Sequence, residues 1–134
     1  MGNEIEKIIC ESKTIAVVGI SAKVDRPSHR VAAYLQSQGY RIIPVNPGQK
    51  EVLGETCYPN LEAVPEKVDV VDIFRRSEDV PPVVEAAIRI GAKAVWMQEG
   101  IINEDAAREA RRAGLAVVMD RCMLKEHKRV KCDG

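Results

Sequence analysis

A short stretch near the amino terminus combines residue types that bind anions. An apolar run at 14–19 ends in Gly19, and a serine, a lysine, an arginine and a second serine follow before a helical pattern begins. Backbone N–H groups at the start of a helix attract negative charge, and Lys and Arg side chains add to that attraction. The spacing therefore predicts a phosphate site formed by Gly19, Ser21, Lys23, Arg26 and Ser28.

Further polar and cationic residues follow the other apolar runs of the chain. When such runs form parallel strands, their carboxyl ends share one edge of the sheet, and ligands bind at that edge. The other residues expected there are Asn46, Pro47, Lys50, Phe74, Arg75, Arg76, Gln98, Glu99, Gly100, Asp120, Arg121 and Cys122. Because these residues follow each of the expected strands, they predict one ligand site to which the end of every strand contributes.

Several of these positions also have an interpretation that needs no ligand. The alternatives are a tight turn at Gly19, a solvated charge at Arg26, a bond from Ser28 to the local backbone, and a bare turn at Asn46-Pro47. Trp96 is interpreted as a core or surface packing residue, and His29 as a solvent-facing side chain beside the loop.

Apolar runs alternate with helical patterns, which predicts an α/β fold. The expected architecture is a Rossmann-like, doubly wound parallel sheet of about five strands with helices on both faces, in the order 3-2-1-4-5. One domain, 1–134, is expected from the length. The expected strands are 14–19, 40–45, 68–74, 94–97 and 115–119, and the expected helices are 3–11, 28–38, 81–90 and the segment between Asn103 and Gly114.

Local signals mark some of the boundaries. Pro44 lacks a backbone donor, which places the 40–45 strand near an edge of the sheet or marks its end. Asn103 is expected to cap the helix that follows it. Residues 49–66 are the least regular part of the chain, with one short helical turn expected at 61–64.

Composition excludes several classes of function. Lys+Arg and Asp+Glu both number 20, so the net charge is zero, which argues against broad nucleic-acid binding. No apolar run approaches the roughly 18 residues of a membrane span, and the amino terminus lacks a signal-peptide profile. The cysteines Cys10, Cys57, Cys122 and Cys132 form no CxxC pair and no compact framework, which favours a reduced, cytoplasmic compartment.

The glycine pattern narrows the class of ligand. An NAD site has a G-x-G-x-x-G loop and an acidic residue at the end of its second strand. Here only the first glycine, Gly19, is present, and the second strand ends at Asn46. An NAD- or nucleotide-binding redox domain stays as an alternative. Cations that instead favour a ligand with several phosphates are Lys23, Arg26, Lys50 and Arg75.

Six segments in order carry a family resemblance: Val18-Gly19-Ile20-Ser21, Arg26-Pro27-Ser28, Val45-Asn46-Pro47, Asp72-Ile73-Phe74-Arg75, Trp96-Met97-Gln98-Glu99-Gly100-Ile101 and Asp120-Arg121-Cys122-Met123. Together they resemble the small stand-alone CoA-binding protein family, which is similar to the CoA-binding domain of the succinyl-CoA synthetase α subunit. The resemblance covers residues 12–127 and implies a Rossmann-like domain that binds coenzyme A or an acyl-CoA.

The resemblance also implies which residues contact the cofactor, in four groups. The residues implied to bind the phosphates are Gly19, Ser21, Lys23, Arg26 and Ser28, and those implied to lie beside the adenosine end are Asn46, Pro47 and Lys50. The residues implied to form a wall beside adenine are Phe74, Arg75 and Val80, and those implied to line the neighbouring strand end are Met97, Gln98, Glu99 and Gly100.

The chain lacks the residue patterns of independent catalysis. It shows no Ser-His-Asp set, no metal-ligand spacing and no P-loop, and neither His29 nor His127 matches the phosphorylated histidine of the synthetases. The prediction is a binding module that is no enzyme. The alternative is an accessory subunit or small enzyme acting on CoA thioesters, with Cys122 as nucleophile or as partner in a mixed disulfide with CoA. A protein partner or a homodimer stays open.

Overall fold

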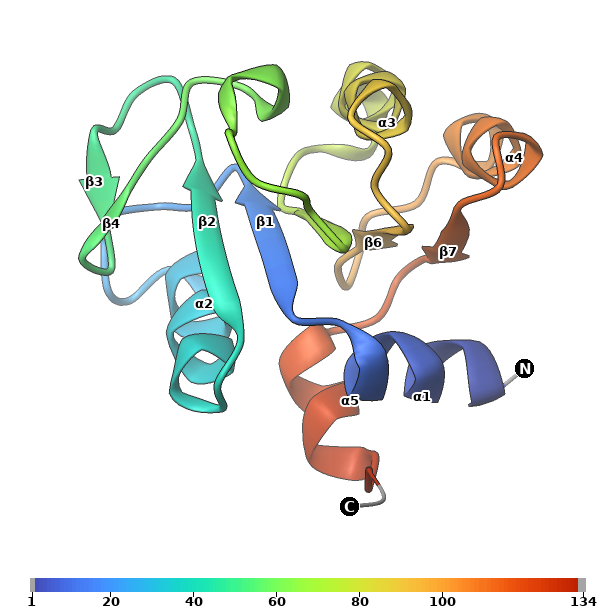
Figure 1. The fold of residues 1–134 in the computed structure, drawn as a ribbon, viewed down its shortest axis with the longest axis horizontal. Coiled ribbons are helices and arrows are strands. Elements are labelled where there is room, and N and C mark those ends of the chain that lie inside the picture. The colour runs from blue at the N-terminus through green and yellow to red at the C-terminus, as the bar shows by residue number, and fades with distance from the viewer. Residues whose placement is uncertain (1, 133–134) are drawn as a thin grey trace.

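The computed structural model describes residues 2–132, and a five-stranded parallel sheet forms its centre (Figure 1). The strands of this sheet are β1 (Thr14–Val18), β2 (Arg41–Val45), β5 (Val70–Ile73), β6 (Ala94–Met97) and β7 (Ala116–Val118). The helices are α1 (Gly2–Glu11), α2 (Pro27–Ser37), α3 (Val80–Arg89), α4 (Glu104–Arg112) and α5 (Met123–Arg129), with 3-10 turns η1 (Leu61–Ala63) and η2 (Ser77–Asp79). Within residues 2–132, no helix combines the length and apolar character of a membrane span.

Helices cover both faces of the sheet, which confirms the predicted α/β, Rossmann-like class. Helices α1, α2 and α5 lie on one face, and α3 and α4 lie on the other (Figure 1). Successive side chains of a strand point to opposite faces. Ile15 and Val17 of β1 therefore pack into the core under α2 and α5, while Ala16 and Val18 pack into the core under α3 and α4.

The predicted strand order was wrong. The observed order is β2-β1-β5-β6-β7, so the third strand of the chain, β5, pairs with β1 and not with β2. The chain leaves β1 for β2 on one side and then returns across β1 to build the rest of the sheet. The point where the winding reverses therefore lies between β1 and β5, rather than between β1 and the fourth strand.

Pro44 gives the physical reason for this order. Its carbonyl accepts a hydrogen bond from the Tyr58 N–H at 3.0 Å, on the side of β2 away from β1. The nitrogen and carbonyl of one strand residue point to the same side, so the missing N–H faces the outer edge and costs no ladder bond. An interior position for β2, as the predicted order requires, would leave a gap in the ladder at Pro44.

Two of the predicted local signals are confirmed. The Asn103 side chain accepts a bond from the Ala106 N–H at 3.0 Å, which confirms the predicted cap of α4. The expected helical turn is η1. A short antiparallel hairpin, β3 (Glu51–Val52) and β4 (Glu55–Thr56), was not predicted, because two-residue strands give no periodic pattern.

The carboxyl-terminal tail differs most from expectation. It forms α5, whose first residue Met123 is fully buried against the sheet, and a disulfide joins Cys10 at the end of α1 to Cys132 after α5. The interpretation of four reduced cysteines was therefore wrong for this pair, whereas Cys57 and Cys122 are free. The two bonded residues are 122 positions apart, and only the packing of α1 beside α5 brings them together.

The outer edge of β7 is closed by a side chain. The Glu4 carboxylate on α1 accepts a hydrogen bond from the Val117 N–H at 3.1 Å. Unpaired edge N–H groups invite pairing with another strand. Glu4 therefore satisfies an edge donor that a five-stranded sheet would otherwise leave open.

Reduction of the Cys10–Cys132 disulfide is expected to destabilise the protein strongly. A disulfide that closes a loop of this length restricts the unfolded chain. Breaking it therefore lowers the free energy of unfolding by about 4–5 kcal/mol, if the effect is treated as chain entropy. The melting temperature should fall by roughly 10–20 °C in reductant, measured by differential scanning calorimetry. Cys132→Ser should melt at the lower temperature with or without reductant. Cys122→Ser, which removes a free thiol, should keep the response of the parent protein; equal melting of oxidised and reduced protein would contradict the disulfide's role.

Candidate functional site

The carboxyl ends of β1 and β5 lie side by side, and the chain leaves them toward opposite faces of the sheet. Gly19 directly follows β1 with φ +88°, and a Cβ at this position would collide with the carbonyl oxygen of Phe74, which directly follows β5. Only glycine permits both the backbone conformation and the close approach. Gly19 therefore opens the gap between the two crossovers, where ligands of doubly wound sheets bind.

One hollow, here called the cationic pocket, lies on the α2 side of this gap. It is open to solvent and has a volume of about 390 Å³. The lining residues are Gly19, Ser21, Lys23, Arg26, Pro27, Ser28, Phe74 and Ile101. All five residues predicted for the phosphates thus come together here. Phe74, which was predicted for the adenine wall, lines this pocket with them.

The start of α2 presents free backbone donors to this pocket. Arg26 is the N-cap without a side-chain cap bond, Pro27 has no N–H, and the first bond of the helix runs from Arg30 N–H to the Arg26 carbonyl at 3.0 Å. The N–H groups of Ser28 and His29 have no acceptor among the described residues. Such donors and the helix dipole suit an anion.

Two basic side chains stand at the same pocket without counterions. Lys23 and Arg26 are exposed, and neither forms an ion pair with a carboxylate of the described residues. By contrast, the exposed Arg76 pairs with Asp79. Unpaired cations therefore lie beside unpaired helix N–H groups. Of the places that the predicted residues form, this pocket is the most favourable for phosphate oxygens.

Two of the predicted contact residues hold the loop after β1 in place. The Ser28 hydroxyl accepts a bond from the Ser21 N–H at 2.9 Å, and the Asn46 side chain donates to the Ile20 carbonyl at 2.7 Å. Asn46 also accepts from the Gly48 N–H at 2.9 Å. The structural interpretations of Ser28 and Asn46 thus describe bonds that are present, and a ligand contact at either residue stays a prediction.

The prediction that His29 faces solvent beside the loop is right only in part. The ring is half-buried, and its Nδ1 lies 2.9 Å from the Ser21 carbonyl oxygen. Because a carbonyl only accepts hydrogen bonds, Nδ1 carries the proton in this contact.

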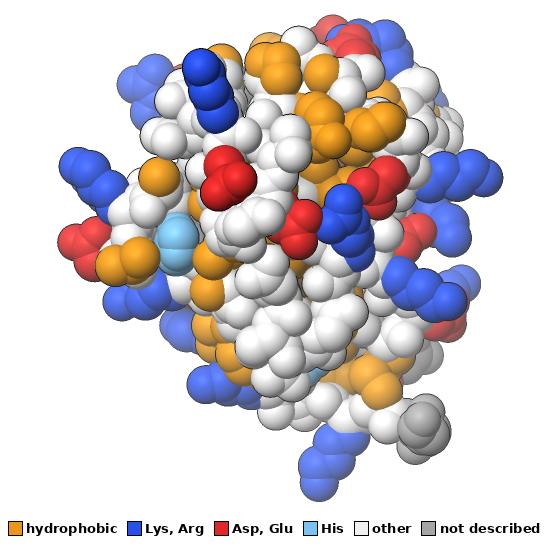
Figure 2. Space-filling model, turned by 60° about the vertical axis from the view of Figure 1, so that its left-hand side comes forward, with side chains coloured by type: hydrophobic (Ala, Val, Ile, Leu, Met, Phe, Trp, Pro, Cys, Tyr) orange, Lys and Arg blue, Asp and Glu red, His pale blue; other side chains and the backbone are white. Residues whose placement is uncertain are grey.

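A second hollow, here called the apolar pocket, lies on the α3 side of the gap. It has a volume of about 330 Å³ and is bounded by η1 and α3. Its lining residues are Val18, Val45, Pro47, Pro59, Asn60, Leu61, Glu62, Arg75, Pro82, Val83, Ala86 and Arg89. Hydrophobic side chains also gather near the top of the face that carries the β3–β4 hairpin, among separate charged groups (Figure 2).

Two predicted residues, Pro47 and Arg75, line the apolar pocket, and Arg75 Cδ also approaches Gly19. Arg75 therefore stands at the boundary between the two pockets. Sequence reasoning missed Pro82 and Val83, which lie on the first turns of α3; their helical pattern signals only packing. Ile101 was part of a quoted segment but was not predicted as a contact residue.

Other predicted residues lie away from both pockets. Val80 and Met97 are completely buried in the core under α3 and α4, so neither offers surface to a ligand in this structure. Lys50 is exposed beside β3 and lines neither pocket. Glu99 pairs with Lys125 of α5 at 3.0 Å.

The loops after β6 and β7 are joined to each other. Gly100 has φ +81°, and its N–H donates to the Asp120 carboxylate at 2.7 Å. Cys122 is half-buried at the N-cap of α5. Its mixed disulfide with CoA stays a prediction.

Asp72 on β5 is a buried acid beneath the site. It has no exposed surface, its Oδ1 accepts a bond from the Gln98 side chain at 2.5 Å, and its Oδ2 has no partner in the described part of the chain. Burial raises the pKa of the Asp72 carboxyl from 3.8 to about 7, against the opposing effect of the Gln98 bond. Gln98 in turn accepts from the Met123 N–H at 3.4 Å, so it joins β5 to α5 and is itself buried.

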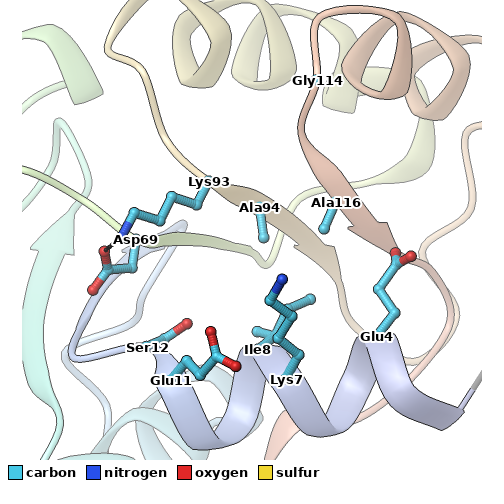
Figure 3. A pocket seen from close by; sticks show the side chains of 10 residues that line it. All are labelled: Glu4, Lys7, Ile8, Glu11, Ser12, Asp69, Lys93, Ala94, Gly114 and Ala116. Atoms are coloured by element: carbon cyan, nitrogen blue, oxygen red, sulfur yellow. Dashed lines mark ion pairs between the residues drawn. The ribbon is translucent and has the colours of Figure 1, made fainter.

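A third hollow, of about 320 Å³, lies at the opposite edge of the sheet, between α1 and the amino ends of the strands (Figure 3). Three of its charged groups, Glu4, Asp69 and Lys93, have partners in the fold. Asp69 accepts from the Lys13 and Thr14 N–H groups and lies 3.5 Å from the Lys93 ammonium, as the dashed line marks. None of the predicted site residues lies there.

Comparisons with known proteins identify the family and the fold. Residues 13–128 match the family described as CoA binding domain. The Bacillus subtilis protein YneT, described as uncharacterized, is 42% identical over 124 residues, which cover 92% of this chain and 92% of YneT. A hypothetical protein from Pyrococcus horikoshii has a solved structure that superposes with a TM-score of 0.94 at 42% identity, covering 97% of this chain and 92% of that one.

A longer enzyme shares the same segment. Acetate–CoA ligase [ADP-forming] II of Archaeoglobus fulgidus is 33% identical over 95 residues, which cover 69% of this chain. They cover only 14% of the ligase, so the similarity concerns one segment of that enzyme.

Gly19→Ala is expected to lower the free energy of unfolding by about 2–3 kcal/mol, from the positive φ and the collision with the Phe74 carbonyl. Gly39→Ala is the matched control, because Gly39 has φ +99° but open space around its Cα. Its loss should be about 1 kcal/mol. Urea denaturation measures both, and equal losses would contradict the close approach of β1 and β5.

Asp72→Asn is expected to change how stability depends on pH. Because the folded-state pKa lies above the unfolded value, the protonated acid favours folding at low pH, and this contribution disappears as pH rises through about 7. Between pH 5 and pH 8 the free energy of unfolding of the variant should therefore rise by about 2–3 kcal/mol relative to that of the parent protein.

Urea denaturation at several pH values measures this difference. A constant offset between Asp72→Asn and the parent protein would refute the raised pKa.

Proposed function

Because the chain belongs to the family of CoA binding domains, we propose that it binds coenzyme A or an acyl-CoA across the gap between β1 and β5, without catalysing a reaction of its own. The observation that carries this proposal is the cationic pocket. Free N–H groups of α2 and the unpaired Lys23 and Arg26 converge there. The pyrophosphate of CoA is the part of the cofactor that such a pocket fits.

The apolar pocket supports a place for adenine. Pro47 and Pro82 offer flat apolar surface, and the Arg75 guanidinium offers a plane on which a base can stack. Because Arg75 lines the apolar pocket and lies beside Gly19 of the cationic pocket, a ligand with its base in one and its diphosphate in the other would span the gap without a break. Lys50, outside both, is the proposed cation for the further phosphate on the ribose.

The rest of the cofactor is assigned to the strand ends beyond Phe74. Phe74 and Ile101 line the wall of the cationic pocket away from α2. The mostly uncharged pantetheine arm suits such apolar side chains. This path leads toward the joined loops after β6 and β7, where Glu99, Gly100 and Cys122 lie.

The buried or paired state of the acidic groups near the strand ends supports the proposed binding role without catalysis. Asp72 is inaccessible, Glu99 is paired with Lys125, and Asp120 holds the Gly100 N–H. The acetate–CoA ligase shares only this segment, so we assign its reaction to the remainder of that longer chain. We propose that this protein presents its ligand to a protein partner or to a second copy of itself.

Isothermal titration of CoA into the protein tests the proposal. Arg26→Glu should weaken CoA binding at least tenfold, because it replaces a phosphate contact by a repulsive charge. Arg112→Glu on α4 reverses an exposed charge far from α2 along the chain and should leave affinity unchanged. Binding should also weaken as salt is added.

Two outcomes would reject the proposal. The first is an absence of binding heat at high micromolar CoA in folded protein. The second is equal affinity of the Arg26→Glu variant and the parent protein. Titration with NAD is the test of the alternative ligand, and tighter binding of NAD than of CoA would replace the proposed cofactor.

A further inference from the structure

The loop after β1 is mostly exposed, yet both backbone groups of one of its residues are held from α2. The Ser21 N–H donates to the Ser28 hydroxyl at 2.9 Å, and the Ser21 carbonyl accepts from His29 Nδ1 at 2.9 Å. Residues 22–27 are all exposed. The side chains at the second and third positions of α2 are therefore the fixed points of an otherwise solvated loop.

The bond from His29 sets the orientation of the peptide between Ser21 and Ala22. In a trans peptide the carbonyl oxygen and the following N–H point in opposite directions. With the Ser21 carbonyl turned to the His29 ring, the Ala22 N–H points away from that ring. No acceptor for the Ala22 N–H exists among the described residues, so this donor is available to a ligand.

We propose that His29 is a positioning residue for the phosphate ligand: its Nδ1–H locks the Ser21–Ala22 peptide so that a donor, and not a carbonyl oxygen, is offered to the anion. This inference rests on the proposed function for the identity of the ligand. It does not make His29 a ligand contact, since its Nδ1 is already occupied by the Ser21 carbonyl.

Bonds on either side anchor the loop, and among the described residues only the His29 bond holds the Ser21–Ala22 peptide itself. On the β2 side, the Asn46 amide holds the Ile20 carbonyl at 2.7 Å. On the far side, the Lys23 N–H donates to the Ser21 hydroxyl at 3.1 Å. Without His29, the Ser21–Ala22 peptide can rotate between these fixed ends. A rotated carbonyl oxygen would repel phosphate, and the free protein would populate a loop that binds the ligand poorly.

Three substitutions separate the hydrogen bond from the bulk of the ring. His29→Ala removes both, and His29→Leu keeps apolar bulk without a donor. His29→Asn retains an amide N–H close to the position of Nδ1. Arg30→Ala, an exposed neighbour on α2, is the matched control.

Two measurements are made on each variant: CoA affinity by isothermal titration, and exchange in the free protein, by NMR, of the Ser21 and Lys23 amides, whose N–H groups bond the Ser28 and Ser21 hydroxyls. His29→Ala and His29→Leu should weaken CoA binding about 5–10-fold, as expected for one lost hydrogen bond that orients a ligand donor. Amide exchange of the loop should accelerate in both. His29→Asn should stay within about threefold of the parent protein in affinity and keep slow exchange.

Parent-like binding and parent-like exchange in His29→Leu would overturn the inference, and so would a His29→Asn variant as impaired as His29→Ala. Should His29→Ala fail to fold, the comparison of the Leu and Asn variants still decides. Should the parent protein not bind CoA, the proposed function fails, whereas amide exchange in the ligand-free variants still tests the peptide lock.

Discussion

The close approach of β1 and β5 at their carboxyl ends is the constraint on which the rest of this structure depends. Gly19 lies so near the Phe74 carbonyl that no side chain fits between them, and its positive φ turns the chain toward α2. From the same point β5 sends its chain to the opposite face. This divergence creates two pockets of different character on the two sides of one gap, cationic beside α2 and apolar beside α3.

Much of the polar chemistry around the gap serves to hold backbone in place. Asn46 and Ser28 fix the loop after β1, and Asp120 fixes the loop after β6. The cations at the pocket are left unpaired. This division follows from electrostatics: a pocket for a polyanion gains by keeping its charges free, while its backbone donors must be aimed before the ligand arrives. Asp72 also holds backbone in place through Gln98, which donates to the Asp72 carboxylate and accepts from the first N–H of α5.

Most predictions from local pattern succeeded, whereas strand order and the pairing of cysteines, which depend on long-range packing, were predicted wrongly. The central strands and the helices α1 to α4 were placed within about two residues, because apolar periodicity and end signals such as Asn103 act over a few positions. Strand order was wrong although Pro44 carried the deciding signal, an edge position for β2. The phosphate residues were brought together as predicted, whereas Val80 and Met97 proved to be core.

The amino-acid sequence by itself determined the α/β class, the element positions and the family, since these follow from local composition and from motifs in order. Only the tertiary structure decided that β5 adjoins β1, that α5 covers the sheet, and that Cys10 meets Cys132. It also decided which polar side chains are free and which are occupied. The physical reason is that burial and hydrogen-bond partners depend on which residues are neighbours in space. Ser28 bonds the Ser21 N–H and Asn46 bonds the Ile20 carbonyl, and no rule of sequence spacing predicts either pair.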